Sequence, residues 1–209
     1  MMAALQHHYE PLQVPDLQFI LWQHNGSTGH VNQVWPKLYL GDAGSGTDCI
    51  PGTIGSWRLG LFGFTARDKS VLRELGITHI LNAASGRYRI NTGPEFYKDL
   101  NIDYYGVEAD DDANFNMSTY FYPAAQFISA GLQCNKGKVL VHCAMGISRA
   151  ASLVLAFLMI SEGLSLLDAL RTVSEHRDIF PNHGFLEQLR QLDIKLQDKR
   201  RSRMDASKI

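Results

Sequence analysis

Short apolar runs alternate with longer segments of helical periodicity along most of this chain. Residues 77–84 and 138–142 are β-branched or apolar with few charges, which is typical of buried strands. Residues 102–109 alternate between apolar and polar positions, as a half-buried strand does. Residues 34–41 have the composition of a first strand that ends at Gly41. The pattern therefore predicts strands at these four places.

Segments between and after these strands place apolar residues at helical spacing. Ser118 is a suitable N-cap for one helix, and Gly76 and Gly163 stand where two others should end. The segment that follows Arg149 is apolar nearly all round, which indicates a buried helix. The predicted helices cover residues 68–75, 118–134, 150–162, 165–176 and 182–199.

Because strands alternate with helices, we predict a single α/β domain with a central, mostly parallel, twisted sheet flanked by helices. This domain should span residues 30–198. Residues 1–29 form an N-terminal extension, in which a short helix capped by Asp16 would dock on the domain through apolar residues such as Phe19 and Trp22. Residues 199–209 are a basic tail, expected to be a solvated, frayed end, with a weak import or docking signal as the alternative.

Residues 44–64 are an atypical glycine-rich insertion. Long loops without secondary structure are uncommon in compact domains, so the tract is either functional or poorly ordered. Its apolar half, residues 57–64, is able to cover part of the sheet. If the insertion instead disrupts the join between the first strand and the first helix, it lowers stability.

The composition excludes several classes of protein. The 209 residues are 45% apolar and 20% charged, and the net charge of −1 gives no basic field for nucleic acid or anionic membranes. The apolar stretch 152–160 is too short to span a bilayer, and the N-terminus lacks the pattern of a secretory signal. Three cysteines at long spacings favour neither a disulfide framework nor a zinc site, and we expect a reducing, cytosolic setting.

One stretch combines a reactive side chain with an anion-binding backbone. Cys143 and Arg149 are separated by five residues, between a predicted strand that ends at His142 and a buried helix. Successive backbone N–H groups at a helix N-terminus are available to a tetrahedral oxyanion. Gly146 lets the loop curl, and the planar guanidinium of Arg149 can bond two phosphate oxygens at once.

The same groups favour the thiolate form of Cys143, which makes it a nucleophile. Ser148 can donate a hydrogen bond to the sulfur, most usefully when the sulfur is the leaving group. Adjacent strand residues point to opposite faces, so His142 has a supporting role through packing and hydrogen bonding. An isolated cysteine is most often a small buried apolar residue, but the full pattern favours the catalytic interpretation.

The segment 142–149 resembles the signature loop of the protein tyrosine phosphatases, and its Gly-x-Ser-Arg ending is similar to that of the dual-specificity branch, in particular its small atypical group. The resemblance extends over residues 30–43 and 65–198 and implies a protein tyrosine phosphatase-like fold. Further pieces of it are residues 34–41, 77–84 and 181–185. The phosphate-binding residues that it implies are Ala144, Met145, Gly146, Ile147, Ser148 and Arg149.

The resemblance also implies a general acid on a loop before the long helix. The family's spacing selects Asp111, which lies 143 − 111 = 32 residues before Cys143. Asp110 and Asp112 remain alternatives. In the implied mechanism Cys143 attacks phosphorus, Asp111 protonates the leaving oxygen, and water then hydrolyses the phosphocysteine. Neither a metal nor another cofactor is expected.

The loop interior carries no lysine or histidine, which argues against an inositol phospholipid substrate. A shallow cleft, as the resemblance implies, admits phosphotyrosine, phosphoserine and phosphothreonine. Ala150 departs from the serine that often follows the signature arginine. We expect a metal-independent dual-specificity protein phosphatase. The rivals are a non-catalytic phosphoprotein-binding or scaffold protein of the same fold, and a phosphatase of RNA or another non-protein phosphate.

Expected partners are phosphorylated proteins, with kinases of signalling cascades and a second copy of the chain as further candidates. Nucleic acid and membranes are not expected partners, and the expected location is the cytoplasm, with the nucleus as a second site. Cys134 is either an ordinary helix-end thiol or a redox partner for Cys143.

Overall fold

In the computed structural model of the protein, which describes residues 9–23, 29–44, 65–86 and 89–206, one sheet has the strand order β1-β2-β5-β3-β4. Strands β2, β5, β3 and β4 are mutually parallel, whereas β1 pairs with β2 in the antiparallel direction. The mostly parallel α/β sheet that the sequence predicts is therefore confirmed. The strand bounds are β1 Val31–Trp35, β2 Leu38–Gly41, β3 His79–Asn82, β4 Asp103–Gly106 and β5 Val139–His142.

The predicted first strand, residues 34–41, is wrong in its extent, because the chain forms a hairpin of two strands there. Pro36 lacks a backbone N–H, and Lys37 has a φ of 62°, in the left-handed region. Both features belong to a tight turn rather than to the middle of a strand. Pairing then begins at Val31, which lies opposite Gly41.

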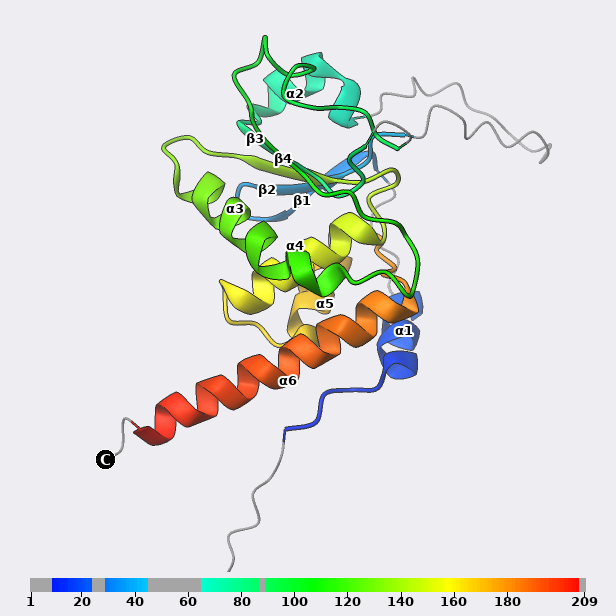
Figure 1. The fold of residues 1–209 in the computed structure, drawn as a ribbon, viewed down its shortest axis with the longest axis vertical. Helices are drawn as coiled ribbons and strands as arrows, with labels where there is room; N and C mark the ends of the chain where they lie inside the picture. The colour runs from blue at the N-terminus through cyan, green and yellow to red at the C-terminus, as the bar shows by residue number, and fades with distance from the viewer. Residues whose placement is uncertain (1–8, 24–28, 45–64, 87–88, 207–209) are drawn as a thin grey trace, which may run out of the picture.

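Helices cover both faces of the sheet (Figure 1). Helix α2 (Lys69–Leu75) and the 3-10 turn η1 (Thr65–Arg67) lie on one face, and the remaining large helices lie on the other. These are α3 (Phe121–Gln133), α4 (Arg149–Ile160), α5 (Leu166–Ser174) and α6 (His183–Ala206). Ten consecutive residues of α4, from Ala150 to Met159, are buried, which explains why this segment is apolar nearly all round.

Local capping explains where several helices begin and end. Asp68 accepts hydrogen bonds from the amides of Ser70 and Val71 at the start of α2, and Gly76 ends this helix with a φ of 70°. Ser165 caps α5 in the same way. The predicted cap at Ser118 is wrong: the segment first forms a 3-10 turn, η2 (Met117–Tyr120), and α3 follows it.

The N-terminal extension contains helix α1 (Val14–Gln23), which begins before Asp16 and lies beside the start of α6 (Figure 1). It buries Val14, Leu17 and Leu21, which share one face of the helix. Phe19 and Trp22, predicted to belong to this apolar face, are 57% and 80% exposed. The docking face of α1 is therefore narrower than its composition indicates.

Helix α6 continues to Ala206, so the tail that was expected to fray from Lys199 is helical to that point. Its residues 201–206 are all exposed, as a solvated segment would be. Most of the glycine-rich insertion, residues 45–64, lies outside the described residues. Within the part of the chain that the structure describes, no helix combines the length and apolarity needed to cross a membrane.

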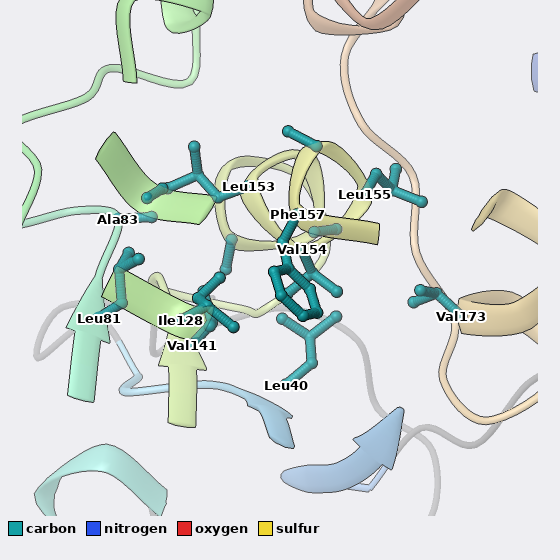
Figure 2. Close-up of a cluster of buried hydrophobic side chains, with 14 of the residues drawn as sticks. Leu40, Leu81, Ala83, Ile128, Val141, Leu153, Val154, Leu155, Phe157 and Val173 are labelled. Carbon is teal, nitrogen blue, oxygen red and sulfur yellow. The ribbon is translucent and has the colours of Figure 1, made fainter. Parts of the chain in front are cut away.

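The main core lies between the sheet and α4 (Figure 2). Leu40, Leu81 and Val141 project from three neighbouring strands to the side of the sheet that α4 covers, where Val154 and Phe157 lie. All five side chains are fully buried. This packing fixes α4 over the central strand β5, and the loop that joins these two elements carries the predicted nucleophile.

Candidate active site

The loop between β5 and α4, residues 143–148, lies at the carboxyl end of the central strand. Its outer side is held by backbone groups from two neighbouring segments. The carbonyl of Ala144 accepts hydrogen bonds from the amides of Ala43 and Gly44, both at 3.1 Å. The carbonyl of Ile147 accepts one from the amide of Phe180, at 2.9 Å. The β2 end and the α5–α6 connection therefore both hold the loop from outside.

The two carbonyls between these contacts are bound by one buried arginine. Arg177 donates from Nη2 to the carbonyl of Met145, at 2.8 Å, and from Nε to the carbonyl of Gly146, at 3.0 Å. In a trans peptide unit the N–H points opposite to the C=O. With the carbonyls of residues 144–147 held outward, the amides of residues 145–148 face the inside of the loop. We call this arrangement the amide cup.

The sulfur of Cys143 lies against this cup. Cys143 is buried, and its Sγ accepts a hydrogen bond from the amide of Gly146 at 3.2 Å. Gly146 has a φ of 71°, and a Cβ at this position would collide with the carbonyl oxygen of Gly41. Glycine is therefore required here both for the backbone conformation and for the space.

His142 is fully buried beneath the loop, and its Nδ1 lies 3.2 Å from the carbonyl oxygen of Cys143. A carbonyl can only accept, so Nδ1 carries the proton of a neutral imidazole. Burial lowers the pKa of His142 from 6.5 to about 4, because a charged ring would be desolvated. His142 is therefore uncharged, and its Nδ1–H supports the peptide unit after Cys143 by a hydrogen bond to the carbonyl of Cys143.

Arg149 begins α4 and pairs with Asp111. The Nε atom of Arg149 lies 3.3 Å from Oδ2 of Asp111, and its Nη1 donates to the carbonyl of Ala109 at 3.4 Å. The other carboxylate oxygen, Oδ1, accepts hydrogen bonds from Ser148 Oγ at 2.7 Å and from Asn182 Nδ2 at 2.9 Å. Asp111 is thus tied to residues 143–148, which we call the phosphate loop, and to the start of α6.

Ser148 has a different partner from the predicted one. Its Oγ donates to Asp111 and accepts from the backbone amide of Asn182 at 3.2 Å. A serine hydroxyl has a single proton to donate, and the bond to Asp111 uses it. In this arrangement Ser148 therefore does not donate to the sulfur of Cys143.

The three consecutive aspartates have different surroundings. Asp110 is exposed, and its carboxylate accepts hydrogen bonds from the guanidinium of Arg89. Asp112 accepts a hydrogen bond from the amide of Asn114 at 2.7 Å, as a turn residue does. Of the three, only Asp111 contacts Ser148 and Arg149 in the described part of the chain. The geometry favours the residue that the family's spacing selects.

Sequence reasoning missed two residues that organise the site. Arg177 sits in an unremarkable polar stretch, and no local pattern marks it as buried. Asn182 bridges two elements: its Oδ1 accepts from the amide of Phe185 at the start of α6, while its Nδ2 donates to Asp111. An Asn before an apolar helix is a recognisable N-cap signal, although the second bond is not predictable from it.

The redox pairing of Cys134 with Cys143 is ruled out by the fold. Cys134 ends α3, with its Sγ 4.0 Å from Nε2 of His79 at the start of β3. His79 pairs with Val139, the first residue of β5, whereas Cys143 follows the last residue of that strand. Four strand rises, about 13 Å, separate Val139 from Cys143. A disulfide needs Cα atoms within roughly 7 Å.

Comparisons with known proteins show the family to which the chain belongs. The family described as "Dual specificity phosphatase, catalytic domain" matches residues 61–195, more than half of the chain. The chain belongs to the dual specificity phosphatase family. Human dual specificity protein phosphatase 13B is 47% identical to it over 189 residues, which covers 90% of this chain and 85% of the relative. The mouse protein of the same name is 46% identical over the same shares.

Solved structures place this dual specificity phosphatase among the atypical members of the family. Human DUSP28 superimposes with a TM-score of 0.64 at 25% identity, over 83% of this chain and 99% of that one. The human tyrosine phosphatase-like serine/threonine/tyrosine-interacting protein gives a TM-score of 0.56 at 28% identity, over 78% and 94%. The likeness to dual specificity protein phosphatase 13 that residues 106–111 and 157–160 indicate is confirmed by the match to 13B.

Proposed function

We propose that this protein hydrolyses phosphate esters of tyrosine, serine and threonine side chains in proteins, through a phosphocysteine at Cys143 and without a metal ion. One observation carries the proposal. The buried sulfur of Cys143 lies against inward-facing amides, and Arg149 and Asp111 meet at the same loop. The family supports phosphatase activity, and the names of the relatives support dual specificity.

In the first step, the thiolate of Cys143 attacks phosphorus in line with the ester oxygen. The S–P bond forms as the P–O bond breaks, and protonated Asp111 gives its proton to the leaving oxygen. The amides of residues 145–148 hold the equatorial phosphate oxygens, with the guanidinium of Arg149 as their cationic partner. For this, Arg149 turns from Asp111 and the carbonyl of Ala109 towards the phosphate, which also releases Asp111 for proton transfer.

In the second step, a water molecule attacks the phosphocysteine. Asp111, now a carboxylate, takes a proton from this water as the O–P bond forms. The S–P bond breaks, inorganic phosphate leaves, and the thiolate of Cys143 is restored. Every proton passes through Asp111, so one carboxyl group serves as acid and then as base.

Hydrolysis of p-nitrophenyl phosphate in the presence of EDTA tests this mechanism. Cys143→Ser should abolish turnover, while the matched variant Cys134→Ser, which changes an exposed thiol far from the loop, should keep wild-type activity. Acid quenching during turnover should trap one phosphoryl group on the peptide that contains Cys143. Activity that survives Cys143→Ser, or that disappears with EDTA and returns with a divalent metal, contradicts the proposal.

Dual specificity is measured with phosphopeptides of one sequence that differ only in the phosphorylated residue. We expect turnover of phosphotyrosine and phosphothreonine forms alike, and none of an inositol phospholipid, since the loop lacks the lysine or histidine that would neutralise further phosphates. Turnover of one peptide alone rejects dual specificity and leaves the cysteine mechanism standing.

A second candidate is a non-catalytic protein that binds phosphorylated partners. The structural likeness to a protein named as phosphatase-like and interacting favours it. A wild-type protein that binds phosphopeptides but leaves them intact over hours would establish this alternative. The presence of Cys143, Arg149 and Asp111 at one loop favours the enzyme.

A further inference from the structure

Arg177 lies in the connection between α5 and α6 and is only 4% exposed. Besides the carbonyls of Met145 and Gly146, its guanidinium donates from Nη1 to Oδ1 of Asn32, at 2.8 Å, and to the carbonyl of Gly29. One side chain therefore joins the phosphate loop to the start of the edge strand β1. None of these bonds, in the described part of the chain, goes to a carboxylate.

Burying a guanidinium among carbonyl groups is costly. Desolvation lowers the pKa of Arg177, while Asp42, Cys143 and Asp178 act in the opposite direction. Asp42 is itself engaged, because its carboxylate accepts from the amide of Thr65 and pairs with a histidine. A neutral amide would bind carbonyl groups at a smaller desolvation cost. An arginine side chain stays protonated in proteins, so a positive charge is buried beside the loop.

The peptide units on either side of Gly146 also need external hydrogen bonds to keep their orientation. Glycine populates positive and negative φ with similar ease, so the peptide units on either side of Gly146 would rotate readily without external bonds. Rotation of either unit would turn a carbonyl oxygen towards the sulfur of Cys143, where it would repel a thiolate and a bound phosphate. Arg177 binds the carbonyl oxygens of both units, those of Met145 and Gly146.

We propose that Arg177 is a positioning residue for the phosphate loop: it holds these two peptide units with their amides towards Cys143, and its positive charge stabilises the thiolate. The proposal rests on the proposed function, because it concerns the same nucleophile. It separates two contributions of one side chain, the planar guanidinium that fixes geometry and the charge that acts on the sulfur.

Arg177→Lys and Arg177→Met separate these contributions. Lysine keeps the charge but lacks the planar pair of donors, and methionine keeps neither. Arg171→Met, which removes an exposed arginine from α5, is the matched control. Two measurements need no turnover: the rate of Cys143 alkylation by iodoacetamide at a fixed, mildly acidic pH, followed by peptide mass, and the protection of Cys143 by inorganic phosphate.

For Arg177→Met we expect Cys143 alkylation at mildly acidic pH to slow about fivefold, because the reacting thiolate loses a nearby positive charge. We expect phosphate protection to weaken by about tenfold, since misdirected amides lose charge-assisted hydrogen bonds. Arg177→Lys should keep the wild-type alkylation rate but show the same weakened protection. Arg171→Met should match the wild type in both measurements.

A wild-type alkylation rate and wild-type protection in folded Arg177→Met overturn the proposal, as do equal changes in Arg171→Met. If Arg177→Met does not fold, phosphate protection in Arg177→Lys and Asn32→Ala tests the proposal instead. Asn32→Ala removes one anchor of the guanidinium and should weaken phosphate protection about threefold, and wild-type protection in both variants rejects the role. Because alkylation and protection are independent of hydrolysis, an inactive wild-type protein would reject the proposed function without deciding the role of Arg177.

Discussion

The Nε atom of Arg149 lies 3.3 Å from Oδ2 of Asp111, so the proposed phosphate clamp and the proposed acid form one ion pair. Only 14% of the arginine side chain is exposed, against 36% for the aspartate. A phosphate that recruits Arg149 competes with Asp111 for the guanidinium. Substrate binding and release of the acid are therefore coupled through one contact.

Asp111→Asn should lower kcat by about 10²–10³-fold for a phosphopeptide, because the leaving alkoxide then receives no proton. The loss should be much smaller for p-nitrophenyl phosphate, whose leaving group is stable as an anion. Asp110→Asn is the matched control, since that carboxylate is paired with Arg89 at the surface. Steady-state kinetics on both substrates checks this. Equal losses in the two variants would show that the wrong aspartate has been assigned.

Gly184→Ala should lower kcat by about tenfold although it favours the helix. In an exposed helix, alanine is more favourable than glycine by roughly 1 kcal/mol. At Gly184, however, a Cβ would collide with the carbonyl of Ala113, on the loop that carries Asp111. The loop must move, and Asp111 with it. Gly93→Ala is the control, because a Cβ there has no neighbour within 4 Å. A fully active Gly184→Ala would mean that the position of this loop is not critical.

The free energy of unfolding should fall as the pH drops below 6.5, through His142. Its pKa is about 4 in the folded protein and 6.5 ordinarily, so between these values the unfolded chain binds a proton that the folded chain does not. Stability from this residue is present above pH 6.5 and is lost towards pH 4, by roughly 3 kcal/mol in all.

Chemical denaturation between pH 7.5 and about 5, where acid effects of carboxylates are still small, measures this slope. His142→Asn should flatten it, because asparagine does not titrate. His176→Asn, which changes an exposed histidine on the surface, should leave the slope as it is. A wild-type slope in His142→Asn would assign the pH dependence to other groups.

Phe157→Ala should reduce the free energy of unfolding by about 3–5 kcal/mol, because it opens a cavity between α4 and the sheet (Figure 2). Phe157 is fully buried, whereas Tyr122 on α3 is 55% exposed. Tyr122→Ala should therefore cost less than about 1 kcal/mol. Denaturant titrations of the two variants provide the comparison. Similar losses in both would contradict the assigned position of α4 in the core.

The sequence by itself determined the elements whose causes are local. The apolar strand before Cys143, the buried helix after Arg149 and the end of α2 at Gly76 follow from neighbouring residues alone. The phosphate loop is predictable from the sequence for the same reason: a strand, a glycine-containing turn and a helix N-terminus are contiguous in the chain. Local rules fail at the first strand, where the turn at Pro36 divides one apolar run into a hairpin.

Only the tertiary structure decided which polar groups meet at the loop. From the residues alone the three aspartates are equivalent, and contact with Arg149 distinguishes Asp111. Ser148 donates to this carboxylate instead of the sulfur because the start of α6 and the acid loop converge there. Arg177 reaches Asn32 across 145 residues of sequence. Hydrogen-bond partners at such separations are set by how the elements pack, and no local pattern in the chain encodes them.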